Sequence, residues 1–157
     1  MRCGWHSAAV TGFRPKMGEN RAPIDAAVLD LFRERARTHP LVGRIEAKSD
    51  FDAISTLVVR FEEDRYPESV SGARLEIQWY ENGEYNVHYH ESHENGRVRQ
   101  CRWDRHPNSH STDAHFHRPS NADTSDVVAD PTASTRPEEM LTRTLANVRQ
   151  RIDELWR

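Results

Sequence analysis

The chain has 157 residues, which suits one domain of ordinary size, and its composition is polar, with 36% hydrophobic and 30% charged residues. No stretch approaches the roughly 18 apolar residues that a membrane span needs, which excludes an integral membrane protein. The formal net charge of −3 at pH 7 provides no overall positive field that would attract nucleic acid.

The N-terminal region has two parts. Residues 1–20 show no hydrophobic periodicity, and we expect a disordered leader there, followed by a single domain over 21–157. The sequence predicts a helix over 22–38, with Pro23 in its first turn and Pro40 just beyond its end. One stripe of this helix is apolar at helical spacing: Ile24, Val28, Leu31 and Phe32.

Strands are predicted where apolar and polar residues alternate. Four such stretches are 53–62, 73–80, 85–91 and 97–104. Residues 105–135 are loop-like, although the pair Val127 and Val128 is consistent with one short strand within them.

The last element is a helix that begins at a capping-box pattern, Thr135 to Glu138. Its apolar stripe consists of Leu141, Leu145, Val148, Ile152 and Leu155. Two amphipathic helices and a sheet with one apolar face need one another to bury their apolar surface. We therefore predict an α+β fold, an antiparallel meander of four or five strands flanked on its apolar face by an N-terminal and a C-terminal helix.

The turn sequences predict the register of the meander. A three-residue loop with Gly83 in the left-handed conformation pairs Trp79 with Tyr85, whereas a two-residue loop would bring histidines onto the apolar face. The same loop ending at Gly96 pairs Tyr89 with Cys101. By this register Cys101 and the tryptophans belong to the core, and polar residues share the opposite face.

Seven of the nine histidines fall within 30 residues, partly on that polar face. Glu76, His88 and Arg102 are expected in one row, and Arg74, His90 and Gln100 in the next. A polar sheet face is often only solvated, but histidines and a central arginine are unusual on such a face. The segment after Asp104 adds further histidines and could fold back over the same face; the sequence leaves open whether residues 105–120 cover it.

Histidine serves as general acid or base near neutral pH, and arginine stabilises charge on phosphoryl oxygens. His88 or His90 with His115 or His117, plus Arg102, would cleave RNA without a metal. The candidate catalytic residues are His88, His90, Arg102, Asp104, His115 and His117, with Asp104 orienting a histidine. The candidate substrate-binding residues are Glu76, Arg74, His106, His110 and Arg118.

Two other classes of function remain open. The same two His-x-His pairs describe a site for zinc or another divalent metal, with Asp104 or Asp113 as the carboxylate. Its ligands would be His88, His90, His115 and His117. A non-enzymatic protein whose polar face docks another chain is the third interpretation.

Several motifs between Tyr85 and Val128 resemble those of the TumE-like toxins of prokaryotic toxin–antitoxin pairs. The matching segments are Tyr85-Asn-Val-His88-Tyr-His90, Arg102-Trp103-Asp104, His106-Pro107-Asn-Ser-His110 and His115-Phe116-His117-Arg118-Pro119, together with the closing helix. Two departures from the family pattern are Arg105-His106-Pro107, where Asn-x-Pro-His-His is usual, and Asp113-Ala114, where a proline is usual.

The resemblance implies a cytoplasmic toxin that a small helix-turn-helix antitoxin neutralises. A cytoplasmic location also fits the two cysteines, Cys3 and Cys101, which cannot form a disulfide framework, and the N-terminus, which lacks the apolar stretch of a secretory signal. The resemblance does not define the chemistry; ribonuclease activity is a hypothesis from the histidines and Arg102.

Overall fold

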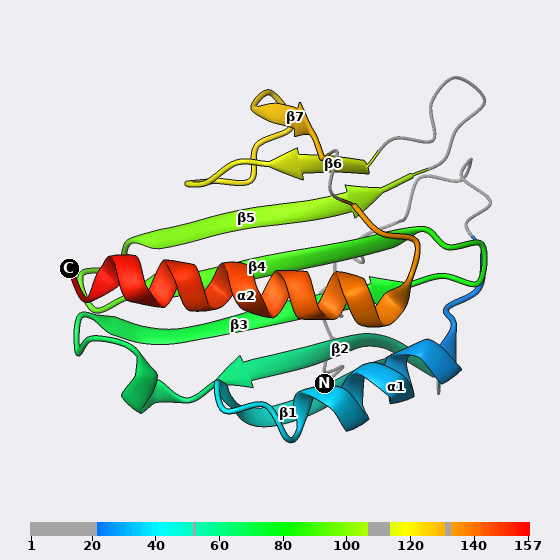
Figure 1. Cartoon of the computed structure of the whole chain (residues 1–157), viewed down its shortest axis with the longest axis horizontal. Helices are drawn as coiled ribbons and strands as arrows, with labels where there is room; N and C mark the ends of the chain where they lie inside the picture. Colours follow the sequence, from blue (N-terminus) through cyan, green and yellow to red (C-terminus); the bar gives the residue numbers. More distant parts are fainter. Residues whose placement is uncertain (1–21, 52, 107–113, 131–132) are drawn as a thin grey trace, which may run out of the picture.

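The computed structural model describes residues 22–51, 53–106, 114–130 and 133–157. The predicted leader over 1–20 lies outside these residues. Within them the chain forms one seven-stranded antiparallel sheet whose strands follow one another in chain order (Figure 1). The strands are β1 (Val42–Asp50), β2 (Ala53–Phe61), β3 (Val70–Trp79), β4 (Tyr85–His93), β5 (Val98–Arg105), β6 (Ala114–His117) and β7 (Val127–Ala129), with a short 3-10 helix, η1 (Glu63–Arg65), between β2 and β3.

The α+β meander is confirmed, but the prediction of four or five strands is too low. The prediction missed β1, although Ile45 and Ala47 face Val59 and Leu57 of β2 and alternate with charged residues. It also missed β6, whose four residues are too few for a clear alternation. Residues 114–117 pair with the edge of β5 instead of folding back over the polar face, because an exposed edge offers unpaired backbone groups.

The predicted register of the central hairpins is confirmed. Trp79 lies opposite Tyr85, and Tyr89 lies opposite Cys101. Gly83 and Gly96 both have φ of 82°, the left-handed conformation that a three-residue loop requires at this position.

Helix α1 (Ala26–Ala36) begins later than predicted because Asp25 is its N-cap. The Asp25 carboxylate accepts a hydrogen bond from the Val28 N–H at 3.1 Å, and the Asp25 N–H donates to the Trp79 carbonyl at 2.9 Å. The chain before the helix is thus held against the end of β3. The buried residues of α1 are Leu29, Phe32 and Ala36. Of the predicted stripe, Phe32 is buried and Ile24 and Val28 are partly buried against the core, whereas Leu31 is not part of it.

Helix α2 (Pro137–Leu155) buries four residues of its predicted stripe, Leu141, Leu145, Val148 and Ile152, and also Met140 and Thr144. Leu155 is only half-buried. The predicted capping box is wrong by one residue: Ser134 accepts from the Arg136 N–H at 3.0 Å and donates to Glu139. Arg136 is the N-cap residue and its side chain does not cap the helix, so the Ser134 hydroxyl and Glu139 stabilise the turn that leads into the helix.

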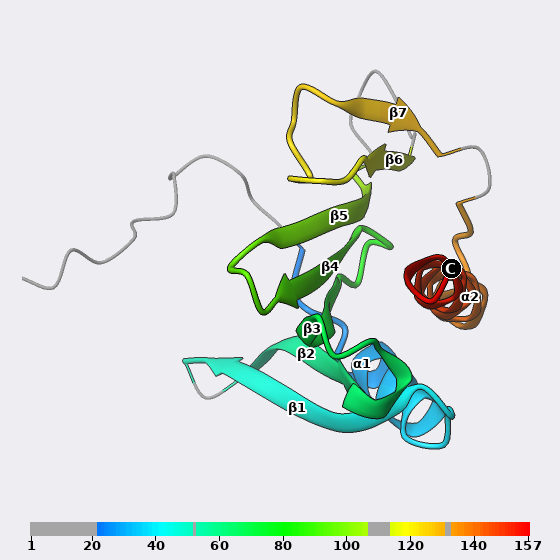
Figure 2. The same cartoon turned by 90° about the vertical axis from the view of Figure 1, so that its left-hand side faces the viewer.

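Both helices lie on the same side of the sheet (Figure 2), as predicted. Their buried residues join the apolar face of the sheet in one core, in which Phe32 contacts Trp79 edge-on with ring centroids 5.7 Å apart. The cover is incomplete beside β5 to β7, where a cavity remains between α2 and the sheet. Among the described residues, neither helix has the length and apolar character that a membrane crossing requires.

Candidate functional site

The sheet face opposite the helices carries three rows of mostly polar side chains, because residues paired across antiparallel strands project from the same face. The rows are Arg44, Arg60, Arg74, His90, Gln100; Glu46, Val58, Glu76, His88, Arg102, His117; and Lys48, Thr56, Gln78, Asn86, Asp104, His115. The predicted rows of Glu76, His88, Arg102 and of Arg74, His90, Gln100 are both present.

At the β5–β6 end of these rows, Arg102, Asp104 and His117 form a closed cluster. The Arg102 Nε donates to both carboxylate oxygens of Asp104, at 2.9 and 3.0 Å, and its Nη2 lies 3.0 Å from the His117 Nε2. The same His117 nitrogen is 2.7 Å from Asp104 Oδ2, while Nδ1 lies 3.3 Å from the Asp123 carbonyl oxygen. Both nitrogens of His117 thus have protein partners, and its side chain is only 8% exposed.

A more accessible imidazole adjoins this cluster. His106 has a side chain that is 40% exposed, with Nε2 3.9 Å from Asp104 Oδ2 and Nδ1 3.8 Å from Glu84 Oε2. His106 follows the last residue of β5, whereas His115 lies opposite Asp104 in the third row. Two imidazoles, His106 and His115, therefore lie near the buried carboxylate of Asp104.

On β4, His88 and His90 form a contacting pair, with ring centroids 3.9 Å apart. Burial lowers the pKa of His88, and the positive charge of Arg102 lowers it further. Burial, followed by the neighbouring His88, lowers the pKa of His90 to about 4. The His88 Nε2 is buried and has no hydrogen-bond partner among the described residues. Both imidazoles are therefore neutral at pH 7.

Glu76 connects this histidine pair to the positive side chains of β1 and β3. Its carboxylate accepts from Lys48 Nζ at 2.9 Å and from Arg74 Nε at 3.1 Å, and it lies 3.9 Å from His90 Nε2. Burial alone would raise the pKa of Glu76, but the hydrogen bonds from Lys48 and Arg74 outweigh that effect and lower it. Glu76 is therefore ionised and holds the two cations in place.

The three rows are more positive than the chain as a whole. They contain five cationic side chains, Arg44, Lys48, Arg60, Arg74 and Arg102, against three carboxylates, Glu46, Glu76 and Asp104. Sequence reasoning missed Arg44, Lys48 and Arg60 as site residues. The alternation of charged residues with Ile45 and Ala47 in β1 was the signal that would have placed two of them on this face.

Among the described residues, two predicted site residues, His106 and Arg118, do not join the rows. Arg118 follows β6, and its Nε lies 3.5 Å from Asp126 Oδ1 at an exposed position. His110 lies outside the described residues. The four histidines of the predicted metal site are divided by β5, and no group of three potential metal ligands occurs within the described part of the chain.

This arrangement combines neutral imidazoles on β4, a guanidinium held by a carboxylate on β5, and further imidazoles at the edge formed by β5 and β6. Strands β4 and β6 are two strand spacings apart, about 10 Å. Groups on opposite sides of Arg102 would therefore approach one phosphate from two directions.

Comparison with known proteins identifies the family of the chain. No curated protein and no solved structure matches it. The family model described as toxin TumE matches residues 28–152, which include the whole sheet and most of both helices. This match confirms the resemblance of the His-rich strands and the closing helix to those toxins. The chain therefore belongs to the TumE toxin family.

Proposed function

We propose that this protein is the toxin of a type II toxin–antitoxin pair and that it cleaves RNA in the cytoplasm by acid–base chemistry on the polar sheet face. Membership of a toxin family supports the first part of the proposal. The observation that carries the second part is the row in which His88, Arg102 and His117 lie opposite one another on β4, β5 and β6.

In the proposed reaction, one imidazole of the β4 pair accepts the proton of a ribose 2′-hydroxyl. That oxygen attacks the adjacent phosphorus and displaces the 5′-oxygen, leaving a 2′,3′-cyclic phosphate and a 5′-hydroxyl. Their lowered pKa keeps His88 and His90 neutral at pH 7, so that each can accept a proton, although a pKa of about 4 makes His90 a weak base. His88 lies opposite Arg102, whereas His90 contacts the hydrogen-bonded Glu76.

Arg102 is proposed to stabilise the charge that develops on the non-bridging phosphoryl oxygens. Asp104 and His117 act as positioning residues, because both contact the Arg102 guanidinium and both are almost fully buried. Three further arginines, Arg44, Arg60 and Arg74, lie side by side on β1, β2 and β3, away from Arg102. They would bind neighbouring phosphates of the RNA.

The leaving 5′-oxygen needs a proton, and we propose that His115 or His106 supplies it. His115 lies opposite Asp104 in the third row, and the side chain of His106, which is 40% exposed, lies 3.9 Å from the same carboxylate. His117 is less suitable as the acid because both of its nitrogens already have protein partners.

The decisive experiment incubates the purified full chain with a labelled RNA and with the same strand carrying 2′-deoxyribose at every position. We expect cleavage of the RNA to a cyclic phosphate and none of the deoxy strand. Arg102→Gln should lower the rate by about 10²-fold or more. Arg35→Gln, on the exposed surface of α1, is the matched control and should leave the rate unchanged.

Single variants His88→Ala, His90→Ala, His106→Ala and His115→Ala then separate the base from the acid. The base variant should lose the acidic limb of the pH–rate profile, and the acid variant the basic limb. Absence of RNA cleavage, or equal cleavage by the Arg102→Gln variant, would refute the proposed chemistry while leaving the family assignment intact.

Toxin families work with an antitoxin, and we propose a small helix-turn-helix protein as the partner. Expression of the chain alone should arrest growth, and co-expression of an adjacent gene for such a protein should restore it. Growth that is unaffected by the chain, although the protein accumulates, would contradict the toxin role.

A further inference from the structure

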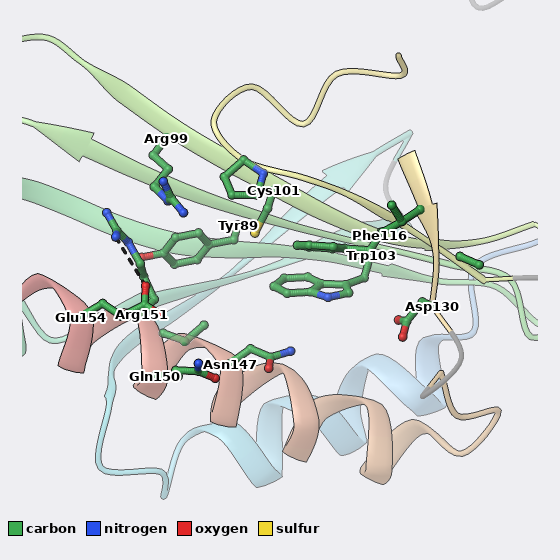
Figure 3. Close-up of a pocket in the computed structure, with 14 residues that line it drawn as sticks. Tyr89, Arg99, Cys101, Trp103, Phe116, Asp130, Asn147, Gln150, Arg151 and Glu154 are labelled. Atoms are coloured by element: carbon green, nitrogen blue, oxygen red, sulfur yellow. Dashed lines mark ion pairs between the residues drawn. The ribbon is translucent and has the colours of Figure 1, made fainter. Parts of the chain in front are cut away.

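A cavity of about 450 Å³ lies between α2 and the sheet, beside the last strands (Figure 3). Its wall on the sheet side comes from Cys101, Trp103 and Phe116, and Val148 of α2 lies opposite them. Trp103 and Phe116 project from the face opposite the Arg102 row, because neighbouring residues of a strand alternate between faces. The cavity is thus separated by the sheet from the proposed RNA-cleaving centre, and its volume is in the range of small-molecule sites.

The sheet wall of this cavity is aromatic, with two rings that stack on each other and leave one outer ring face for a ligand. Trp103 and Phe116 are paired across β5 and β6, with ring centroids 5.3 Å apart and an angle of 25° between the planes. Burial raises the pKa of the adjacent Cys101 thiol to about 12, so the thiol is neutral and apolar in character. Such a wall favours a planar aromatic ligand, because a flat ring makes the largest contact with it.

Two amides face this wall from α2. Asn147 and Gln150 both line the cavity, and Figure 3 shows Asn147 directed toward Trp103. Neither side chain has a hydrogen bond to another described residue. Gln150 is exposed to solvent, whereas Asn147 is half-buried. An aliphatic ligand would leave the Asn147 amide without a partner, whereas the edge of a nucleobase offers it both donors and acceptors.

A second, smaller cavity of about 170 Å³ adjoins the first and shares Arg99 and Arg151 with it. It is also lined by Arg97 and His93. Arg151 and His93 already have an acidic partner, because each contacts the buried carboxylate of Glu91 at 2.7 Å.

The remaining two cations of the small cavity, Arg97 and Arg99, have no carboxylate partner among the described residues. The two acidic groups that line the large cavity each have a cationic partner. Glu154 lies 3.8 Å from Arg151, and Asp130 accepts two hydrogen bonds from Arg143 at 3.1 and 2.9 Å. The small cavity therefore has an excess of positive charge next to an aromatic wall.

We propose that these joined cavities bind a nucleoside 5′-phosphate. The base lies against Trp103 with its edge toward Asn147, and the phosphate lies against Arg99, which lines both cavities. The ligand is either a free mononucleotide or the 5′-phosphorylated end of an RNA strand, which share this chemistry. This site is additional to the proposed cleavage centre and lies on the other face of the sheet.

Isothermal titration of the full chain tests the proposal, with AMP, GMP, adenosine and ribose 5-phosphate as probes. A mononucleotide should bind at least about tenfold more tightly than the probe that lacks either the phosphate or the base, since a charge-assisted hydrogen bond is worth at least that factor. Equal affinity for AMP and adenosine, or no binding of either nucleotide at millimolar concentration, would overturn the proposal.

Variants locate the binding. Arg99→Gln and Asn147→Ala should each weaken mononucleotide binding, the former by about tenfold or more. Arg149→Gln is the matched control, because Arg149 is exposed on α2 and does not line either cavity. Retention of full affinity by both Arg99→Gln and Asn147→Ala would place the nucleotide elsewhere and refute the assignment.

The two sources are distinguished by comparing a 5′-phosphorylated with a 5′-hydroxyl RNA tetramer. If the phosphorylated tetramer binds more tightly than the mononucleotide, the ligand is an RNA end; the opposite order identifies a free nucleotide. Equal affinity for the phosphorylated tetramer, the hydroxyl tetramer and the mononucleotide would contradict recognition of the phosphate. Arg35→Gln, which is exposed on α1 and lines neither cavity, should leave all of these affinities unchanged. Mononucleotides lack the internucleotide bond that the proposed centre cleaves, so failure of RNA cleavage and failure of this site are separate results.

Discussion

Acidification is expected to destabilise the fold through His90. Its side chain is only 16% exposed, and burial together with the neighbouring His88 lowers its pKa from 6.5 to about 4. The unfolded chain therefore binds a proton on this residue at a pH at which the folded chain does not. Stability that depends on His90 is complete above pH 6.5 and is lost as the pH falls toward 4.

The size of the effect follows from the pKa difference. One pKa unit corresponds to about 1.4 kcal/mol, so the complete loss is about 3 kcal/mol. About 2 kcal/mol of this stabilisation is lost between pH 7 and pH 5, which is above the pH range in which most carboxylates take up protons. With a urea dependence of about 2 kcal/mol per molar, the unfolding midpoint should fall by about 1 M over that interval.

The assay is urea unfolding followed by circular dichroism at pH 7, 6 and 5, for the natural chain and for His90→Asn. Between pH 7 and 5, the free energy of unfolding of the variant should fall by about 2 kcal/mol less than that of the natural chain. His106→Asn, at a side chain that is 40% exposed, is the control and should follow the natural chain. An identical pH dependence of the natural chain and His90→Asn would refute the reasoning.

Other substitutions test the packing and the site. Arg151→Met should cost about 3 kcal/mol in urea unfolding, because it leaves the fully buried carboxylate of Glu91 without its guanidinium partner. Gly83→Ala should cost about 1–2 kcal/mol because φ is 82°, whereas Gly72→Ala, with no atom within 4 Å of the added methyl group, should be close to neutral. Asp104→Asn should lower RNA cleavage by about 10²-fold by releasing Arg102. Cleavage measured in EDTA should equal that measured without it, and a loss of activity restored by zinc would favour the metal alternative.

The alternation of apolar and polar residues was enough to predict the central strands and their register. Only one register brings Trp79 opposite Tyr85 and keeps the histidines off the core, and Gly83 permits the turn that this register needs. The row of His88 and Arg102 followed from that local information. The start of α1 was not predicted, because Asp25 is fixed by a hydrogen bond to the distant Trp79 carbonyl.

Two features, the pairing of β6 and the position of α2, depend on the tertiary structure and could not be predicted from local sequence. Strand β6 is too short to have a clear period, so only its pairing with β5 brings His117 to 2.7 Å from Asp104. The position of α2 depends on contacts such as that of Glu91 with Arg151, which are 60 residues apart. Local sequence determined which side chains share a strand face, because side-chain direction is a property of the backbone. The pairing of edge strands and the position of a helix depend on long-range contacts. Those contacts determine which side chains of the site meet and where a cavity remains between α2 and the sheet.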